Sequence, residues 1–526
     1  MVWQGRAGNR APYADFSSRG GRYSAFEEAP QSRMNAQSPA DAEAYRLMRA
    51  GRLAQALTVA RQAVAAKTAC SPAHGVLAMI LLRLGRAAEA DAVIESAVAG
   101  PPGLADAYNS LAHVSAALGR HERANALYRR ATELGPGVSR HWFNLASSER
   151  ALGRLEQAEE ACDRAIALDA CEYRGYLLRS ELRVQTAARN HIEQLRGELA
   201  RPGLEDGARV LLGYALGKEL DDLGRYEEAF PCFALAASTR RRHLAYDVAA
   251  DERAFRSIAD AFPSNADALA HGRIDSSRFV FVVGLPRSGT TLLERILTGL
   301  PGVRSNGETD NFERAVRAAV PAHRLPADQH AAAALGRAAA TGWDSIAAHY
   351  LRLADPDDGG QVIVEKLPIN YLYLGAIRRA LPQARLVLLN RCAVDVCFAM
   401  YRTLFGEAYQ FTYDFGDLAR YYAGYSSLIA HWRGAFGEAL HEVAYEDLVG
   451  DPARIGQGLA RACGLAWHES AVAVESNGAV CLTQSAAQVR RPIYRSSLGR
   501  WRHYRGQLEP LIEALGRYGA GVPRLE

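Results

Sequence analysis

Lysine is almost absent from this chain. Of its 526 residues 62 are Lys or Arg, and only three of these, Lys67, Lys218 and Lys366, are lysine. Because arginine supplies nearly every positive charge, a lysine is not the default cation here. Lys366, which follows an apolar run, is therefore a candidate for a role that needs a compact ammonium group.

Other absences narrow the class of protein. No apolar run approaches the roughly 20 residues of a membrane span, and the N-terminal stretch lacks the apolar core of a signal peptide. The eight cysteines form no CxxC pair and no Cys/His spacing typical of zinc, so we expect free thiols, a reducing compartment and no metal. A net charge of +4 gives no reason to expect nucleic acid or a membrane as a partner. These features favour a cytoplasmic protein and leave its oligomeric state open.

A repeat of 34 residues occupies the first half of the chain. The dipeptide Gly-Arg recurs at this period, and each copy is followed by alanines five and twelve positions after the glycine. The glycines are Gly51, Gly85, Gly119 and Gly153, and Gly224 repeats the signature after an irregular stretch around 187–200. A glycine in the turn of a helix pair, with small residues where the helices touch, is typical of the tetratricopeptide family, which this half resembles. Such repeats form a groove for a peptide or partner protein, or act as a spacer against the next domain.

A Gly-bounded loop after an apolar run predicts an anion site. The five apolar residues at 279–283, directly before Gly284, predict a short buried strand, and a helical pattern starts at Thr290. The spacing from Gly284 to Gly289 is that of a nucleotide P-loop, but Thr290 and Thr291 stand where a nucleoside triphosphatase needs Lys followed by Ser or Thr. We expect backbone N–H groups at the helix start to hold phosphate, with Arg287 as the cation.

Alternating apolar runs and helical segments follow this loop. They predict strands at 361–366, 384–391 and within 441–448, and helices at 372–381 and 394–405. Continuous Val, Leu and Ile runs between helices indicate a parallel sheet covered on both faces, with ligands at the carboxyl ends of the strands. The loop, Lys366 and Arg391 each lie at such an end. We also expect the Ala-rich interval 305–360 to be helical and, with the aromatic stretch 402–425, to form the wall of an acceptor pocket.

Five motifs in this order resemble the sulfotransferase family. More narrowly, the chain resembles bacterial proteins in which tetratricopeptide repeats precede a domain similar to tyrosylprotein sulfotransferase. The motifs are GLPRSGTTLLE (284–294), GET (307–309), EKLPINYLYL (365–374), LVLLNR (386–391) and SAAQVRRPIYRSSLGRW (485–501). The resemblance covers roughly 278–510 and implies transfer of a sulfuryl group from 3'-phosphoadenosine-5'-phosphosulfate (PAPS) to a hydroxyl, without a metal.

The sequence therefore predicts a multidomain chain. An all-α tetratricopeptide repeat solenoid is followed by an α/β, P-loop-like, three-layer sulfotransferase domain with a parallel sheet. The predicted parts are a disordered leader at 1–38, the repeats at 39–245, a capping or linker helix at 246–277, and the PAPS-dependent sulfotransferase domain at 278–526.

The resemblance implies three catalytic residues. Glu308 matches the family's general base, and Lys366 matches the lysine placed on the bridging oxygen of the leaving phosphate. Ser485 matches the serine that assists this lysine. From the residues alone, Glu308 is also consistent with a helix N-cap or first-turn acid, and Asp310 and Glu313 are the neighbouring alternatives for the base.

The resemblance further implies a set of PAPS-binding residues. By this resemblance, the 5'-phosphosulfate is bound by the loop residues Arg287, Ser288, Gly289, Thr290 and Thr291.

The resemblance assigns binding of the rest of the nucleotide to residues further along the chain. Arg391 matches the arginine that binds the 3'-phosphate, Tyr445 matches a tyrosine near the nucleotide, and Arg500 stands where the family has a basic residue near it. Arg490 and Arg491 are either further contacts or surface residues.

The chain departs from the family pattern next to Arg391. The family usually has a serine eight residues later, hydrogen-bonded to the same phosphate, and this chain has Ala399. It also has Cys392 and Ala393 where a more polar or Pro-containing turn is common. Loss of one hydroxyl contact costs roughly 0.5–1.5 kcal/mol, or about tenfold in affinity, unless another donor takes over.

Several interpretations of the function stay open at this point. The favoured acceptor is tyrosine of a peptide or protein recruited by the repeat groove, and a sugar or lipid-linked hydroxyl is the alternative. A non-catalytic tetratricopeptide scaffold with a degenerate nucleotide-binding domain would explain Ala399. A P-loop kinase or nucleoside triphosphatase is opposed by Thr290 at the lysine position.

Overall fold

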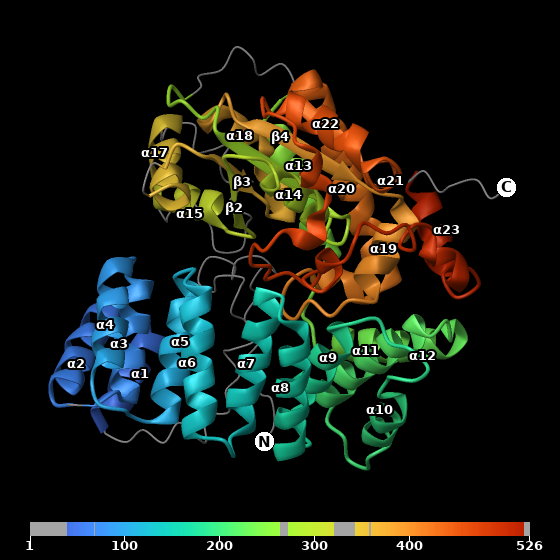
Figure 1. Cartoon of the computed structure of the whole chain (residues 1–526). Coiled ribbons are helices and arrows are strands. Elements are labelled where there is room, and N and C mark those ends of the chain that lie inside the picture. The colour runs from blue at the N-terminus through green and yellow to red at the C-terminus, as the bar shows by residue number, and fades with distance from the viewer. Residues whose placement is uncertain (1–38, 68, 264–271, 320–341, 357–358, 520–526) are drawn as a thin grey trace. The chain divides into compact units, whose positions relative to one another are not determined.

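A computed structural model describes residues 39–67, 69–263, 272–319, 342–356 and 359–519 (Figure 1). Within these residues, contacts divide the chain into two compact units. One contains 39–204 with Gly478–Cys481, and the other contains Glu205–Asn477 with the segment that starts at Leu482. The leader predicted at 1–38 lies outside the described residues.

The first unit is a series of helix pairs. They are α1 (Pro39–Arg49) with α2 (Leu53–Ala65), α3 (Pro72–Arg83) with α4 (Ala87–Ala99), α5 (Ala105–Ala117) with α6 (His121–Leu134), and α7 (Ser139–Leu152) with α8 (Leu155–Leu168). The shorter α9 (Tyr173–Glu181) and α10 (Ile192–Leu199) follow. In the turn of each regular pair the repeated glycine has a φ of +74° to +82°, a left-handed conformation that favours glycine. Alanines at the predicted positions are buried where the helices touch, for example Ala90 and Ala124. The predicted repeat is confirmed.

A fifth helix pair with the same signature packs within the second unit. Helix α11 (Asp206–Asp222) turns at Gly224, with a φ of +74°, into α12 (Tyr226–Arg242). The Tyr214 hydroxyl donates to the Tyr401 carbonyl at 3.2 Å. Helix α13 (Val248–Ala261) packs Phe255 against Tyr421, with ring centroids 5.2 Å apart. These helices therefore form part of the unit that contains the sheet, and the boundaries predicted at 245 and 277 stay predictions.

Five parallel strands form the sheet of the second unit. They are β1 (Phe279–Gly284), β2 (Val303–Gly307), β3 (Val362–Glu365), β4 (Arg385–Asn390) and β5 (Leu440–Ala444), in the order β2-β3-β1-β4-β5. Four of them were predicted. Strand β2 was not, and the expectation that 305–360 is helical is wrong at its start. The reason is that VRSNG is short and polar, and only pairing with β3 makes it a strand.

Alternate side chains of β1 pack on opposite layers of helices. Val280 and Val282 face α14 (Thr290–Thr298) and α22 (Pro452–Ala462) in one hydrophobic cluster. Phe279 packs against Tyr350 of α17 (Trp343–Ala354), with ring centroids 5.2 Å apart, and Phe281 packs against Phe312 of α15 (Asn311–Ala319) at 6.2 Å. The sheet is therefore covered on both faces, which confirms the predicted three-layer α/β domain.

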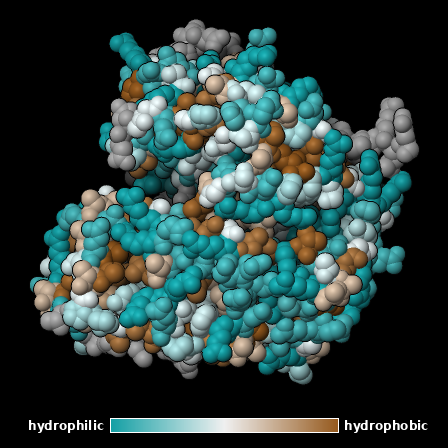
Figure 2. Space-filling model, in the orientation of Figure 1, coloured by the Kyte–Doolittle hydropathy of each residue, from teal (hydrophilic) through white to brown (hydrophobic). Residues whose placement is uncertain are grey.

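The remaining elements complete the second unit. They are the 3₁₀-helix η5 (Pro368–Tyr373), α18 (Leu374–Ala380), α19 (Ala393–Tyr401), η6 (Gln410–Tyr413), α20 (Phe415–Phe436), η7 (Gly437–Ala439), α21 (Tyr445–Gly450), η8 (Glu469–Val472), η9 (Val474–Ser476), η10 (Gln488–Arg490), η11 (Arg500–Tyr504) and α23 (Glu509–Arg517). Several aromatic rings of 402–425 are core residues, since Phe411 stacks on Tyr421 at 3.5 Å. Figure 2 shows a mostly hydrophilic face with smaller hydrophobic groups. Over the described ranges no helix has the length and apolar character needed to cross a bilayer.

Candidate functional site

The loop between β1 and α14 has a backbone that only a few residue types tolerate. Gly289, immediately before α14, has a φ of +109°, and a Cβ there would lie 2.4 Å from the Tyr445 ring. Arg287 has a φ of +66°, unusual for a residue other than glycine and often associated with functional sites. The loop therefore turns sharply and presents the N-terminus of α14, where unpaired N–H groups attract an anion.

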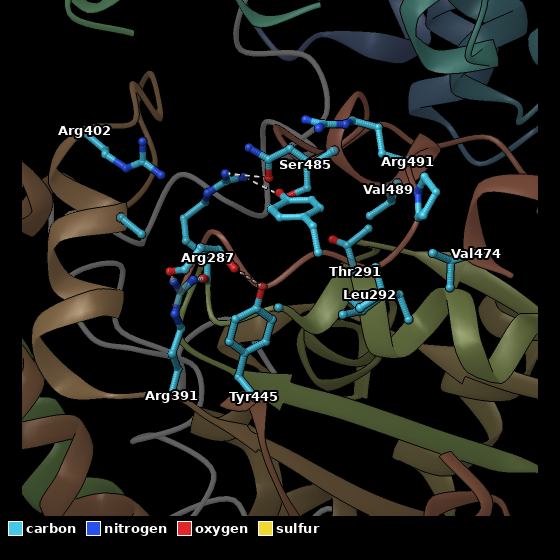
Figure 3. A pocket seen from close by; sticks show the side chains of 17 residues that line it. Arg287, Thr291, Leu292, Arg391, Arg402, Tyr445, Val474, Ser485, Val489 and Arg491 are labelled. Carbon is cyan, nitrogen blue, oxygen red and sulfur yellow. Dashed lines mark hydrogen bonds between the residues drawn. The ribbon is translucent and has the colours of Figure 1, made fainter. Parts of the chain in front are cut away.

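Arg287 joins this loop to the C-terminal segment of the unit. Its Nη1 donates to Ser485 Oγ at 2.6 Å and its Nη2 donates to Gln488 Oε1 at 2.9 Å (Figure 3). The hydroxyl of Thr291 lies 3.5 Å from that of Thr483. The structure thus brings Ser485 to the loop, although the two are almost 200 residues apart in the sequence.

Arg391 reaches the same loop from the carboxyl end of β4. Its Nη1 donates to the Arg287 carbonyl at 2.9 Å and its Nη2 to the Ser497 carbonyl at 2.7 Å. The guanidinium lies 4.6 Å from the centre of the Tyr445 ring, and the Tyr445 and Ser497 hydroxyls are 2.8 Å apart. Burial raises the pKa of the Tyr445 phenol, so the hydroxyl stays protonated at neutral pH.

These residues line a pocket with an empty volume of about 690 Å³, including the part open to solvent (Figure 3). Four arginines belong to its wall, namely Arg287, Arg391, Arg402 and Arg491, and no Asp or Glu is among the lining residues. Apolar side chains such as Leu292 complete the wall. A wall with this charge suits a ligand with several negative charges.

Ser288 lines a second cavity, together with Arg391 and Tyr422. Ser288 is 1% exposed, and its Oγ has no hydrogen-bond partner within the described part of the chain. A buried hydroxyl in this state is a donor for a bound group or for water.

Lys366 is a buried ammonium between two carboxylates. It follows β3 directly and is 0% exposed. Its Nζ donates to Glu308 Oε1 at 2.6 Å and lies 3.5 Å from Glu294 Oε2. Glu294 also accepts a hydrogen bond from the Ser305 hydroxyl. The Glu308 side chain is 34% exposed and the Glu294 side chain 12%, so Glu308 is the carboxylate that a ligand can reach.

The turn that carries Glu308 is held by a second buried acid, Glu365. Its carboxylate accepts hydrogen bonds from Asn306 at 2.6 Å, Thr309 at 2.7 Å and Asn311 at 3.1 Å. Burial raises the pKa of Glu365 despite these donors. Glu308 therefore has a fixed main chain at the edge of the sheet.

The structure places the predicted site residues in two adjoining groups and one separate position. The loop, Ser485, Arg391 and Tyr445 meet around the cationic pocket, and Glu308 meets Lys366 beside α14. Ser485 contacts Arg287, so its partnership with Lys366 stays a prediction.

Arg500 lies elsewhere. Its Nη2 donates to Asp221 Oδ2 at 2.7 Å, and it is not among the residues that line the pocket. Of the alternatives to Glu308, Glu313 forms an ion pair with Arg317 of its own helix at 2.6 Å.

Three residues at these sites were missed in the sequence. Glu294 follows Thr290 by four positions on α14, a helical spacing that places both on one face and could have indicated it. Arg402 follows Ala399 by three. Gln488 had no local signal, because its place at Arg287 depends on how the C-terminal segment folds back. Over the described residues, no cluster of three or more His, Cys, Asp or Glu side chains is arranged to hold a metal ion.

Comparison with known proteins gives two family matches. Residues 280–469 match the sulfotransferase family, and residues 42–105 and 109–171 match the tetratricopeptide repeat. A relative from Aquifex aeolicus (strain VF5), described as an uncharacterized protein, is 28% identical over 342 residues, which are 64% of this chain. The aligned part spans only 45% of that relative's length.

Solved structures with some similarity include sulfotransferase domains and a repeat protein. The sulfotransferase domain of the Synechococcus PCC 7002 olefin synthase is 16% identical, with a TM-score of 0.28 over 45% of this chain and 96% of its own. Sulfotransferase STF1 from Mycobacterium tuberculosis H37Rv is 15% identical, with a TM-score of 0.28 over 66% and 98%. Pseudomonas aeruginosa pilF is 19% identical, with a TM-score of 0.28 over 38% and 87%.

Proposed function

Because the chain carries a sulfotransferase-family domain after tetratricopeptide repeats, we propose that it transfers a sulfuryl group from PAPS to an acceptor hydroxyl. The observation that carries the proposal is the buried Lys366 ammonium, paired with the accessible Glu308 carboxylate at the edge of the sheet where the cationic pocket lies. The favoured acceptor is tyrosine of a peptide or protein, recruited by the repeats. The scattered cysteines support the cytoplasm as the location.

The charge of the pocket wall supports PAPS as the donor. When bound, PAPS supplies the activated sulfuryl group and a leaving phosphate. Arg287, the N–H groups at the start of α14 and the hydroxyl of Thr291 would hold the 5' side in this pocket. The resemblance assigns Ser288 and Thr290 to the same group; they are not among the residues that line the pocket, and their roles stay predictions. No carboxylate in the lining opposes the negative charge.

The 3' side would be held near Arg391, whose guanidinium is already oriented by two carbonyls. Tyr445 packs on that guanidinium and would contact the nucleotide. The family role expected of Arg500 stays a prediction, because its guanidinium binds Asp221.

The chemical step would use the second group. Glu308 would accept the proton of the acceptor hydroxyl, which its exposed oxygen can reach. Lys366 would then move its hydrogen bond from Glu308 to the oxygen that gains negative charge on the leaving phosphate. Ser485 would be the further donor that the resemblance implies. The loop would keep donor and acceptor in line, so positioning and electrostatics supply most of the rate enhancement.

Calorimetric titration with adenosine 3',5'-bisphosphate tests the donor site. We expect binding by the intact chain and loss of most of it in Arg391→Ala. Magnesium-dependent ATP binding in place of this result would support a nucleoside triphosphatase instead.

Radiolabelled PAPS with a tyrosine-peptide library and a glycan panel tests transfer and identifies the acceptor class. We expect Glu308→Gln to abolish transfer, and Glu313→Gln, a nearby glutamate paired with Arg317, to retain it. Full transfer by Glu308→Gln would show that Glu308 is not the base. Nucleotide binding without transfer to any acceptor would favour the scaffold interpretation, and transfer only to glycans would favour a carbohydrate sulfotransferase.

A further inference from the structure

Two residues of the pocket lie next to each other at the end of α19. Ala399 and Arg402 are three positions apart, a spacing that places them on the same side of the last helical turn. Both line the pocket, as does Arg391 (Figure 3). The methyl group of Ala399 offers no hydrogen bond to an anion at this place, whereas the guanidinium of Arg402 offers five N–H donors.

Arg402 is held in place by a buried carboxylate from a distant part of the unit. Its Nη1 donates to Asp221 Oδ2 at 2.7 Å, and Asp221 lies at the end of α11 and is 1% exposed. The same carboxylate accepts from Arg500 at 2.7 Å and from the Tyr504 hydroxyl at 2.6 Å. Burial alone would raise the pKa of Asp221, but the charges of Arg402 and Arg500 outweigh it and lower the pKa, so the group stays ionised.

The bond to Asp221 thus orients the Arg402 guanidinium and occupies only part of its hydrogen-bonding capacity. One bond to Asp221 leaves further N–H groups on a side chain that is 22% exposed and forms part of the pocket wall. Asp221 itself is not a lining residue, so its negative charge orients the arginine from behind the wall.

We propose that Arg402 binds the 3'-phosphate of the nucleotide together with Arg391, in place of the serine that the sequence lacks at position 399, and that Asp221 positions it. This rests on the proposed function, because it specifies how the same pocket takes its donor. A charged donor is about twice as strong a hydrogen-bond partner as a neutral hydroxyl. Arg402 then compensates for the hydroxyl that is missing at Ala399, and α11 contributes to the nucleotide site through Asp221.

The test compares two nucleotides that differ in one phosphate. Adenosine 3',5'-bisphosphate and adenosine 5'-monophosphate are titrated into the full chain and its variants. We expect Arg402→Ala to weaken binding of the bisphosphate by about 10- to 100-fold, the effect of losing one hydrogen bond to a charged group, and binding of the monophosphate by less than about threefold. Arg402→Gln, which keeps a polar side chain but removes the guanidinium, should show the same selective loss. Arg420→Ala removes an ion pair with Glu252 outside the pocket and should change neither affinity.

A hydroxyl restored at position 399 gives a second measurement. In Ala399→Ser combined with Arg402→Ala we expect part of the lost bisphosphate affinity to return, up to about tenfold. Asp221→Asn should also lower the affinity ratio between the two nucleotides, which a merely structural role would not change.

The outcomes separate this inference from the proposed function. If the unaltered chain binds the bisphosphate and both Arg402 variants bind it equally well, or lose both nucleotides alike, the role of Arg402 is refuted and the donor site stands. If the unaltered chain binds neither nucleotide, the proposed function itself is wrong.

Discussion

Replacement of Lys366 by methionine removes the buried ammonium that lies between the carboxylates of Glu308 and Glu294. Lys366→Met replaces the side chain by an unbranched apolar one about as long as the lysine stem without its ammonium, so packing at the end of β3 changes little. What is lost is the cation that Glu308 contacts at 2.6 Å and Glu294 approaches at 3.5 Å.

The size of the effect follows from how buried each partner is. Removal of one member of a buried ion pair typically costs about 3–5 kcal/mol, because a charge is left without its counterion. Glu308 is one-third exposed and water can solvate part of its charge, whereas Glu294 is nearly covered. We therefore expect the low end, about 3 kcal/mol of unfolding free energy. Combined with Glu294→Gln, which removes the more buried carboxylate, the variant should recover most of this loss.

Catalysis and stability are measured separately. Chemical denaturation followed by circular dichroism gives the unfolding free energy, and labelled PAPS with the pooled acceptors gives the transfer rate. Loss of one donor to a developing negative charge typically lowers the rate by about 10²- to 10³-fold. We expect this loss in Lys366→Met and equally in its combination with Glu294→Gln.

The combined variant decides the outcome. If the combined variant regains its stability and transfers at the rate of the unaltered chain, Lys366 only neutralises Glu308 and Glu294 and does not act on the leaving group. Unchanged stability in the single variant would show that the two carboxylates do not need the ammonium.

Three further predictions concern the loop, the repeats and a helix cap. Gly289→Ala places a Cβ 2.4 Å from the Tyr445 ring at a φ of +109° and should abolish nucleotide binding. Gly302→Ala has a φ of +73° in open space and should lower the free energy of unfolding by only about 1–2 kcal/mol. Calorimetry measures the binding of both variants and thermal unfolding their stability. Burial lowers the pKa of His113 to about 4, below the unfolded value of about 6.5, so the unfolded chain binds the proton first. The free energy of unfolding of the repeat unit should fall by about 3 kcal/mol as the pH falls from 6.5 to 4, and in His113→Gln it should fall by less. Hydrogen exchange of the amides of α5, compared at the same pH, measures this difference. Asp414 caps α20 by accepting from the N–H groups of residues 416 and 417, and Asp414→Ala should cost about 0.5–2 kcal/mol in the same unfolding assay.

Features that depend on local sequence were predictable. The 34-residue period fixes helix pairs because a glycine turn and small contact residues act within one repeat, and apolar runs such as 384–391 fix buried strands for similar local reasons. Strand β2 was missed because its residues carry no such pattern and its pairing with β3 is a contact between segments about 60 residues apart.

The sequence by itself determined which chemical groups are available. The Gly284–Gly289 loop without its lysine, the rare Lys366 after a strand, and Arg391 at the end of another strand follow from motifs and from the rule that parallel strands end at one edge.

Only the tertiary structure decided which groups meet. It pairs Lys366 with Glu308 and Glu294, directs Arg287 to Ser485, and orients Arg402 through Asp221, about 180 residues away. The physical reason is that a buried charge needs a partner close in space, and distance along the chain has no influence on which partner the fold supplies.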